Sequence, residues 1–274
     1  MYFNGNICVI TGSGSGIGRA LALGLGSRGA TVIASDIHET NVKETAALVN
    51  EAGPGKAIAE AIDVSNEDAV SLHINRVADQ YGRIDLIINN AGIAITGEAR
   101  DLSIEHWRRV INVNLMGVLY GSDTAYKIMT CQGFGHIVNI SSLSGLVPFP
   151  TNIPYGTTKY AIVGLTAGLR AEGEALGVKV SIVCPGFIES NIYTSSEAVN
   201  VSKENLTDIL PFRMVPVHKA AEKILKGIER NDAVIIFPGY AKFIWWLHRI
   251  SARLTARTSR RLITDFRKLR NNND

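Results

Sequence analysis

Tyr155 and Lys159 have the residue types and the spacing to move a proton. Pro154 suits the start of a helix, and apolar residues recur at helical spacing after Lys159, so both side chains should share one helix face. A tyrosine hydroxyl has a pKa of about 10, and a nearby ammonium favours its charged form. We therefore predict that Lys159 lowers the Tyr155 pKa and that the pair is a general acid/base for a hydroxyl group. A solvated pair on an ordinary helix is the alternative interpretation.

A glycine-rich turn, Thr11-Gly12-Ser13-Gly14-Ser15-Gly16-Ile17-Gly18, lies between an expected strand at 7–10 and an apolar helix. A second strand at 31–34 leads to Asp36. This order is typical of dinucleotide-binding folds, because glycines let the backbone approach a pyrophosphate at a helix N-terminus. An acid in the position of Asp36 can accept hydrogen bonds from ribose hydroxyls and repels a 2′-phosphate. We predict nucleotide binding here rather than plain turn chemistry.

Strands and helices alternate along the rest of the chain. Helices are expected at 41–50, 66–81, 103–129 and 218–230, and strands at 57–61, 84–88, 136–140, 178–184 and 233–237. This alternation, with continuous apolar strands, predicts an α/β fold, a Rossmann-like doubly wound parallel sheet with helices on both faces. Ligands bind beyond the carboxyl ends of such strands, where polar residues cluster in this sequence. They are Asp36, Asp63, Asn89, Ser142 and Pro185-Gly186.

The length of 274 residues suits one large domain, and we place it at 1–240 with an extension at 241–274. The net charge of +3 is modest and does not favour nucleic-acid binding. Three widely separated cysteines provide neither a disulfide framework nor a metal-binding spacing. The first residues lack signal-peptide features, and no apolar run is long enough to span a membrane, so we expect a cytoplasmic location.

Together these motifs resemble the short-chain dehydrogenase/reductase family in its single-domain form, over about residues 7–237. They are Thr11-Gly12-x-x-x-Gly16-x-Gly18, Asp63-Val64, Asn89-Asn90-Ala91-Gly92, Asn114, Ser142, Tyr155-x-x-x-Lys159 and Pro185-Gly186. The resemblance implies an NAD(P)-dependent oxidoreductase that interconverts a secondary alcohol and a ketone, or an aldehyde.

The same resemblance implies four catalytic residues and no metal. Asn114 would hold a water in a proton relay, and Ser142 would hydrogen-bond the substrate oxygen. Tyr155 would give or take the hydroxyl proton, while Lys159 would bind the nicotinamide ribose. The implied cofactor-binding residues are Gly12, Ser15, Gly16, Ile17, Gly18, Asp36, Asp63, Val64, Asn90, Ala91, Gly92, Tyr155, Lys159, Pro185, Gly186, Ile188 and Ser190. Plainer interpretations are that Asn114 only bends its helix and that Ser142 only caps a turn.

NAD is the expected cofactor, and NADP is less favoured. The family commonly recruits a 2′-phosphate with basic residues where this chain has Ser15 and Ile37. Asp36 opposes that phosphate, whereas Arg19 and His38 leave NADP open.

The segment 187–216 should be the variable substrate loop. Its apolar residues predict a hydrophobic alcohol or ketone substrate, although they would also suit packing around a small polar one. They are Phe187, Ile188, Ile192, Tyr193, Leu206, Ile209, Leu210, Phe212 and Met214, supplemented by the apolar loop 145–153.

The tail from Lys242 to Asp274 carries nine Lys or Arg residues against two Asp. We expect one basic amphipathic helix in which Phe243, Trp246, Leu247, Ile250 and Leu254 share a face. Such a helix is typical of peripheral membrane contact through 241–270, and it would equally suit packing on the subunit or on an oligomer partner.

The resemblance also implies a homo-dimer or homo-tetramer built on the long helix near 103–129 and on the Tyr155 helix. In the latter, Gly164, Ala167, Gly168 and Ala171 would allow close helix approach. A nucleotide-sensing protein without turnover, or a protein that acts mainly at the membrane surface, is the competing hypothesis.

Overall fold

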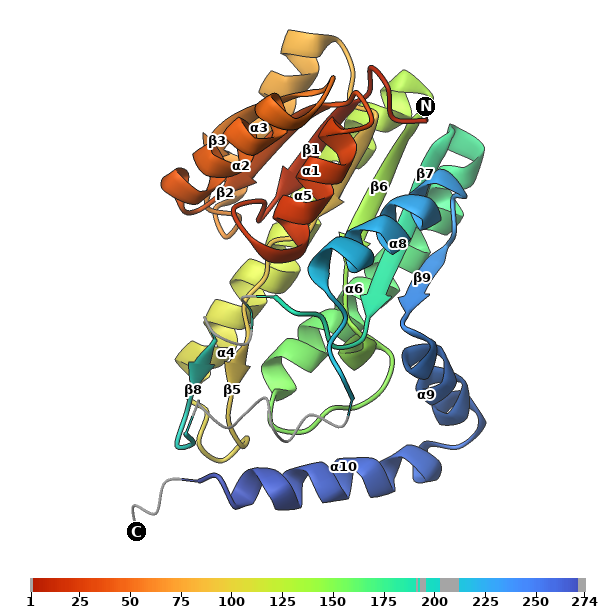
Figure 1. Cartoon of the computed structure of the whole chain (residues 1–274). Coiled ribbons are helices and arrows are strands. Elements are labelled where there is room, and N and C mark those ends of the chain that lie inside the picture. Colours follow the sequence, from red (N-terminus) through yellow and green to blue (C-terminus); the bar gives the residue numbers. More distant parts are fainter. Residues whose placement is uncertain (1, 191, 193–195, 203–211, 271–274) are drawn as a thin grey trace.

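A seven-stranded sheet forms the centre of the molecule (Figure 1). The structure, a computed structural model, describes residues 2–190, 192, 196–202 and 212–270, and the expected loop residues Tyr193, Leu206, Ile209 and Leu210 lie outside that part. All strands are parallel, in the order β3-β2-β1-β4-β6-β7-β9. Their bounds are β1 Ile7–Thr11, β2 Thr31–Asp36, β3 Lys56–Ala61, β4 Leu86–Asn89, β6 Gly135–Ile140, β7 Val178–Pro185 and β9 Val234–Phe237.

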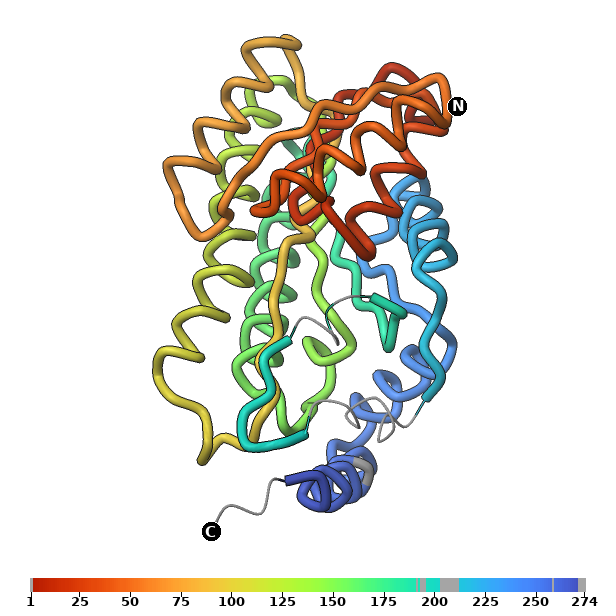
Figure 2. The backbone as a smooth tube through the Cα atoms, turned by 60° about the vertical axis from the view of Figure 1, so that its left-hand side comes forward, coloured from red at the N-terminus to blue at the C-terminus, as the bar shows by residue number. Residues whose placement is uncertain are grey.

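Helices cover both faces of the sheet (Figure 2). Helices α1 Gly16–Gly26, α2 Glu39–Ala52 and α8 Val217–Glu229 pack on one face. Helices α3 Glu67–Tyr81, α5 Gly117–Gln132 and α6 Ile153–Gly173 pack on the other. Within the described residues the remaining α-helices are α4 Ile104–Ile111, α9 Gly239–Ile250 and α10 Ala252–Arg267. The predicted doubly wound α/β fold is therefore confirmed.

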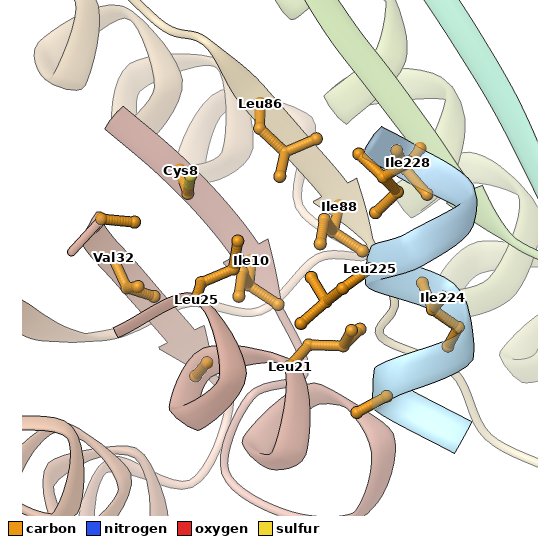
Figure 3. Close-up of a cluster of buried hydrophobic side chains, with 14 of the residues drawn as sticks. Cys8, Ile10, Leu21, Leu25, Val32, Leu86, Ile88, Ile224, Leu225 and Ile228 are labelled. Atoms are coloured by element: carbon orange, nitrogen blue, oxygen red, sulfur yellow. The ribbon is translucent and has the colours of Figure 1, made fainter. Parts of the chain in front are cut away.

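The core follows from the alternation of side chains along each buried strand. In β1, Cys8 and Ile10 face α1 and α8, where Leu21, Leu25 and Leu225 meet them (Figure 3). The intervening residues of β1 face the opposite helices. Because both faces are covered, the strands are continuously apolar, which is why the sequence reads as uninterrupted Val/Ile runs.

The helix expected at 103–129 contains an interruption. Helix α4 continues through a π-helical turn, Asn112–Met116, into α5. Asn114 lies at the centre of this turn, and π-helical turns inside helices are frequent at functional sites. A short pair of strands, β5 Ile95–Thr96 and β8 Glu197–Ala198, was not expected from the sequence.

The expectation of one continuous tail helix is wrong. Helix α9 ends at Ile250, the backbone of Ser251 is extended, and α10 then begins in a new direction (Figure 1). Leu254 therefore does not continue the helical face of Phe243 and Trp246. The new direction of α10 allows Leu262 and Phe266 to be buried. These two side chains hold α10 across the carboxyl-end edge of the sheet.

Candidate active site

A cavity of about 700 Å³ lies at the carboxyl ends of the strands. Residues at the ends of β1, β2, β4, β6 and β7 line it, together with residues of α6 and α10. Strand β1 lies between β2 and β4, so the chain order reverses here, as at the switch point where open α/β sheets bind ligands. All the predicted site residues line the cavity except Gly18 and Asn114.

Two glycines of the first turn allow its backbone to pack closely. Gly12 has a φ of +64°, and a Cβ there would lie 2.7 Å from the Cα of Ala91. A Cβ on Gly18 would lie 2.1 Å from the carbonyl oxygen of Gly12. Gly18 thus packs α1 against the turn and does not face the cavity. Ser15, Gly16 and Ile17 do line it, so the first turn of α1, whose N–H groups have no partner within the helix, borders the cavity.

Asp36 ends β2 at the edge of this cavity. Its carboxylate accepts hydrogen bonds from the backbone N–H of Gly14 at 2.9 Å and of His38 at 3.0 Å. Arg19 is engaged elsewhere: its guanidinium donates to the Gly14 carbonyl at 2.6 Å and pairs with Glu44 at 2.7 Å. Arg19 and His38 were the two residues that could bind the 2′-phosphate of NADP, and only His38 lines the cavity.

The β3 and β4 ends complete this half of the cavity with Asp63, Val64, Asn90, Ala91 and Gly92. The Asn90 amide donates to the carbonyl oxygens of Thr11 and Gly12, both at 2.9 Å. The Thr11 hydroxyl accepts from the backbone N–H groups of Asn90 and Ala91, at 3.0 and 3.1 Å. Sequence reasoning quoted Thr11 in its motif without a role, and the structure gives it one, joining the ends of β1 and β4.

Helix α6 presents Tyr155 and Lys159 as expected, one turn apart, and Ser142 faces them from the end of β6. The Lys159 ammonium lies 5.3 Å from the centre of the Tyr155 ring and donates to the Ile140 carbonyl at 2.8 Å. The Ser142 side chain hydrogen-bonds the Tyr155 hydroxyl. It also accepts from the Ser144 N–H at 3.1 Å, so it caps a turn as well as facing the cavity.

The predicted direction of the Tyr155 pKa shift is wrong for the protein alone. Burial raises the pKa of Tyr155 to about 12, and the hydrogen bond with Ser142 opposes this shift only in part. Burial also lowers the pKa of Lys159 to about 8. Removal from water disfavours both charged forms, and the ammonium of Lys159 hydrogen-bonds a backbone carbonyl. At neutral pH the site therefore holds a protonated phenol.

Asn114 is fully buried and lies behind the cavity wall. Its amide donates to the Ile93 carbonyl at 2.9 Å and accepts from the Ile93 N–H at 2.8 Å. It also lies 3.4 Å from the Thr158 hydroxyl of α6. These bonds fix the segment after β4 against α6, and the role of Asn114 in holding a relay water stays a prediction.

The other half of the cavity is lined mainly by apolar side chains. Pro185, Gly186, Ile188 and Ser190 follow β7 as expected. The large apolar residues beyond them are Phe149, Phe187, Ile192, Leu262 and Phe266. Phe212, expected in the same lining, instead stacks on Tyr240 with ring centres 4.1 Å apart. The sequence analysis did not predict that Leu262 and Phe266 of α10 line the cavity. Their four-residue spacing, which places them on one helix face, was the signal available for it.

Ion pairs hold α10 in place. Glu98, only 7% exposed, pairs with Arg267 at 3.0 Å and with Arg270 at 3.1 Å. Arg270 also pairs with Asp101. The hydrogen bond from Arg267 lowers the pKa of Glu98, and that from Arg270 lowers the pKa of Asp101. The end of the tail is thus fixed to the loop after β5, on the apolar side of the cavity.

Comparison with known proteins agrees with this arrangement. A family model described as short chain dehydrogenase matches residues 6–200. The 3-oxoacyl-[acyl-carrier-protein] reductase FabG of Thermotoga maritima is 38% identical over 192 residues, 69% of this chain and 77% of FabG. The putative oxidoreductase SadH of Mycobacterium tuberculosis is 33% identical over 253 residues, 90% of this chain and 91% of SadH.

A longer relative matches over only part of its length. The probable oxidoreductase EphD of Mycobacterium bovis is 32% identical over 269 residues, 94% of this chain and 45% of EphD, so the chain spans about half the length of that relative.

Solved structures show the same fold. A short-chain dehydrogenase/reductase from Burkholderia phymatum, in complex with NAD, superposes with a TM-score of 0.84 at 28% identity, covering 93% of this chain and 96% of that one. Levodione reductase superposes with a TM-score of 0.79 at 27% identity, covering 86% and 97%. The family match extends over most of the sheet and over the Tyr155 helix, and the chain belongs to the short-chain dehydrogenase/reductase family of oxidoreductases.

Proposed function

We propose that this chain is an NAD-dependent oxidoreductase that interconverts a hydrophobic secondary alcohol and the corresponding ketone, or an aldehyde, with Tyr155 as acid/base. The observation that carries this proposal is the shared cavity. Ser142, Tyr155 and Lys159 line the same space as the glycine turn and Asp36.

The residues of the first half fit a dinucleotide with a free 2′-hydroxyl. Gly12 leaves no room for a side chain, so backbone borders the cavity next to the first turn of α1. The Asp36 carboxylate would accept hydrogen bonds from ribose hydroxyls, and Arg19 is held by Gly14 and Glu44. The NAD complex of the similar Burkholderia phymatum protein supports this choice.

The chain's own residues would manage the proton and the substrate oxygen. A bound nicotinamide supplies the hydride chemistry. In the direction of reduction, Ser142 and Tyr155 would both donate to the carbonyl oxygen and stabilise the charge that develops on it. Since burial raises its pKa, Tyr155 holds its proton until that oxygen becomes basic. Lys159, within reach of the same space, would then favour the phenolate that remains.

The apolar half of the cavity supports a hydrophobic substrate. Five large apolar side chains line it, and Arg109 and Glu197, which also border the cavity, neutralise each other at 2.7 Å. Two similar proteins are named as reductases, one of a 3-oxoacyl group and one of levodione, which supports a carbonyl substrate.

The direct test measures nicotinamide absorbance with NAD or NADP and a series of ketones and alcohols of increasing apolar character. We expect turnover to favour NAD and to rise with apolar character. Calorimetric binding of NAD should be measured in parallel. Tight NAD binding with no turnover on any member of the series would favour the nucleotide-sensing alternative, and an absence of NAD binding would refute both.

A homo-oligomer is part of this proposal. On α6, a Cβ added at Gly164 or Gly168 would meet no other described element of the chain within 4 Å, and Ala167 and Ala171 beside them are exposed. This flat stripe would let the same helix of a second copy approach closely. Sedimentation velocity of the protein and of Gly168→Leu tests it, because a bulky side chain there should weaken association at least tenfold.

A further inference from the structure

The tail leaves one side of each helix uncovered. On α9, Ala241 is buried, and Ile244 and Trp245 pack against the domain core. On α10, Leu262 and Phe266 are buried. These contacts and the pairs to Glu98 and Asp101 fix the tail on the body of the protein. The outer sides of α9 and α10 therefore form a defined surface, which we call the tail surface.

Large apolar side chains gather on this surface. Phe243, Trp246 and Ile250 are 60%, 57% and 60% exposed and recur at helical spacing on α9. The rings of Phe243 and Trp246 lie 6.2 Å apart. Exposed apolar side chains that share one helix face in this way mark interaction sites, whereas single ones elsewhere on the molecule are ordinary.

The charge around these side chains is of one sign. From Gly239 to Thr264 the chain contains no Asp or Glu, and its basic residues are Lys242, Arg249, Arg253, Arg257, Arg260 and Arg261. Within the described part of the chain, the first five of these have no acid within 4.0 Å, and Arg261 has one only at 3.9 Å. Some exposed basic residues elsewhere, such as Lys43 and Lys127, are paired with acids on their own helices.

We infer that the tail surface docks on an anionic lipid bilayer. Exposed aromatic and aliphatic side chains would enter the interface, and the arginines beside them would meet lipid phosphates while their stems stay apolar. Trp246 has the amphipathic ring that membrane interfaces favour. Among the described residues no helix is long and apolar enough to cross a bilayer.

A second copy of the chain fits this surface poorly. Two tail surfaces brought face to face would place rows of unpaired arginines opposite one another, and like charges in contact oppose association. A bilayer containing anionic lipid offers the opposite charge and an apolar interior together, which matches both features of the surface.

The tail surface and the substrate cavity share one helix. Leu262 and Phe266 line the cavity from the inner side of α10, while Arg253, Arg257 and Arg260 lie exposed on the same helix. Docking would thus bring the apolar half of the cavity close to the bilayer, where hydrophobic alcohols and ketones concentrate. This last step rests on the proposed function, whereas the docking itself does not.

The experiment is co-sedimentation of the full chain with vesicles of phosphatidylcholine, alone or mixed with phosphatidylglycerol. We expect binding to the mixed vesicles that weakens as salt is added. In Arg253→Glu/Arg257→Glu/Arg260→Glu the partition coefficient should fall about 100-fold or more, since each arginine near the surface contributes about fivefold. The control Lys56→Glu/Lys219→Glu/Lys223→Glu changes the net charge by the same amount at exposed positions outside the tail. Its partition coefficient should fall less than about threefold.

A second pair of variants separates the apolar contribution. Phe243→Ser/Trp246→Ser should weaken vesicle binding about tenfold or more, and Leu72→Ser/Ile104→Ser, exposed elsewhere, should not. Equal binding by the tail and control variants would overturn the proposal, as would retention on a heparin column without any vesicle binding. Turnover of a water-soluble substrate should be unchanged in all four variants, so failure of docking is distinguishable from failure of the proposed function.

Discussion

The two halves of the cavity are built in different ways. The nucleotide half is held by backbone and by glycines: Gly12 and Gly18 pack against backbone atoms, and Thr11 and Asn90 bond main-chain groups. The apolar half is assembled from side chains that are far apart in the sequence, Phe149, Phe187 and Phe266 among them. Its outer wall is closed by ion pairs to Glu98.

This difference predicts how each half responds to substitution. Backbone and glycine packing tolerate few substitutions, so the nucleotide half suits one ligand class. Side chains and ion pairs can be exchanged one at a time without disturbing the sheet. We therefore expect changes in the first half to abolish function and changes in the second to alter substrate preference.

The largest effect should come from Tyr155→Phe, at the junction of the two halves. Loss of the hydroxyl removes the proton donor and leaves the ring packing in place, so kcat should fall about 1000-fold while NAD affinity changes less than threefold. Steady-state kinetics and calorimetry measure the two quantities. If NAD binding fell as much as kcat, Tyr155 would be a cofactor contact and not the acid/base.

Gly18→Ala should disable the nucleotide half through packing alone. The new Cβ would lie 2.1 Å from the Gly12 carbonyl oxygen, which forces α1 away from the turn. We expect a loss of about 2–3 kcal/mol in the free energy of unfolding, measured in denaturant, together with loss of NAD binding. Gly239→Ala is the control, because a Cβ there would meet no other described element within 4 Å. A fully stable Gly18→Ala would contradict the packing role.

Most of the nucleotide half was predictable from the sequence because its signals are local. The glycine turn, Asp36 and the Tyr155–Lys159 spacing each lie within one strand–turn–helix unit, and each reaches the cavity as expected. The role of Thr11 was missed because its partners, Asn90 and Ala91, lie about 80 residues away.

The position of the wall formed by α10 could not be predicted from sequence patterns, although the spacing of Leu262 and Phe266 indicates which side of the helix is buried. The position of α10 depends on the helix break at Ser251 and on the ion pair between Glu98 and Arg267, which are 169 residues apart in the sequence. A basic amphipathic pattern fits membrane contact and packing equally well, and the structure assigns different residues of the tail to different surfaces. The sign of the Tyr155 pKa shift was also wrong, because spacing alone does not reveal burial.

Asp36→Asn tests the nucleotide half at almost unchanged side-chain volume, although the amide can accept only one of the two backbone hydrogen bonds from Gly14 and His38. Loss of the charge weakens the hydrogen bonds to ribose hydroxyls and removes the repulsion of a 2′-phosphate, so the preference for NAD over NADP should fall about 10- to 100-fold. The ratio of kcat/KM for the two cofactors measures it. An unchanged ratio would mean that another residue selects the cofactor.

Phe266→Ala should open the apolar wall and spare the nucleotide half. We expect kcat/KM for a hydrophobic ketone to fall about tenfold, because the substrate loses most of the free energy of burial against one phenyl group. The KM for NAD should stay constant. Phe243→Ala, which removes an exposed ring outside the cavity, is the matched control. An equal effect of both variants would show that Phe266 has no specific contact with the substrate.

The smallest effect should be a pH-dependent loosening of α10. The pKa of Glu98 is lowered below its ordinary value of 4.5, mainly by the hydrogen bond from Arg267, so its ion pairs stabilise α10 fully above about pH 4.5 and are lost as the pH falls through the lower folded value. Hydrogen exchange of α10 amides, corrected for the intrinsic rate, should therefore accelerate several-fold between pH 6 and pH 3, while α1, which carries no such pair to the tail, stays protected. Glu98→Gln should exchange faster at both pH values and lose most of the pH dependence; the Asp101 pair with Arg270, whose pKa is lowered in the same direction, accounts for the remainder. Equal acceleration in α1 and α10 would mean that acid loosens the whole domain, and that the two halves are not held by different forces.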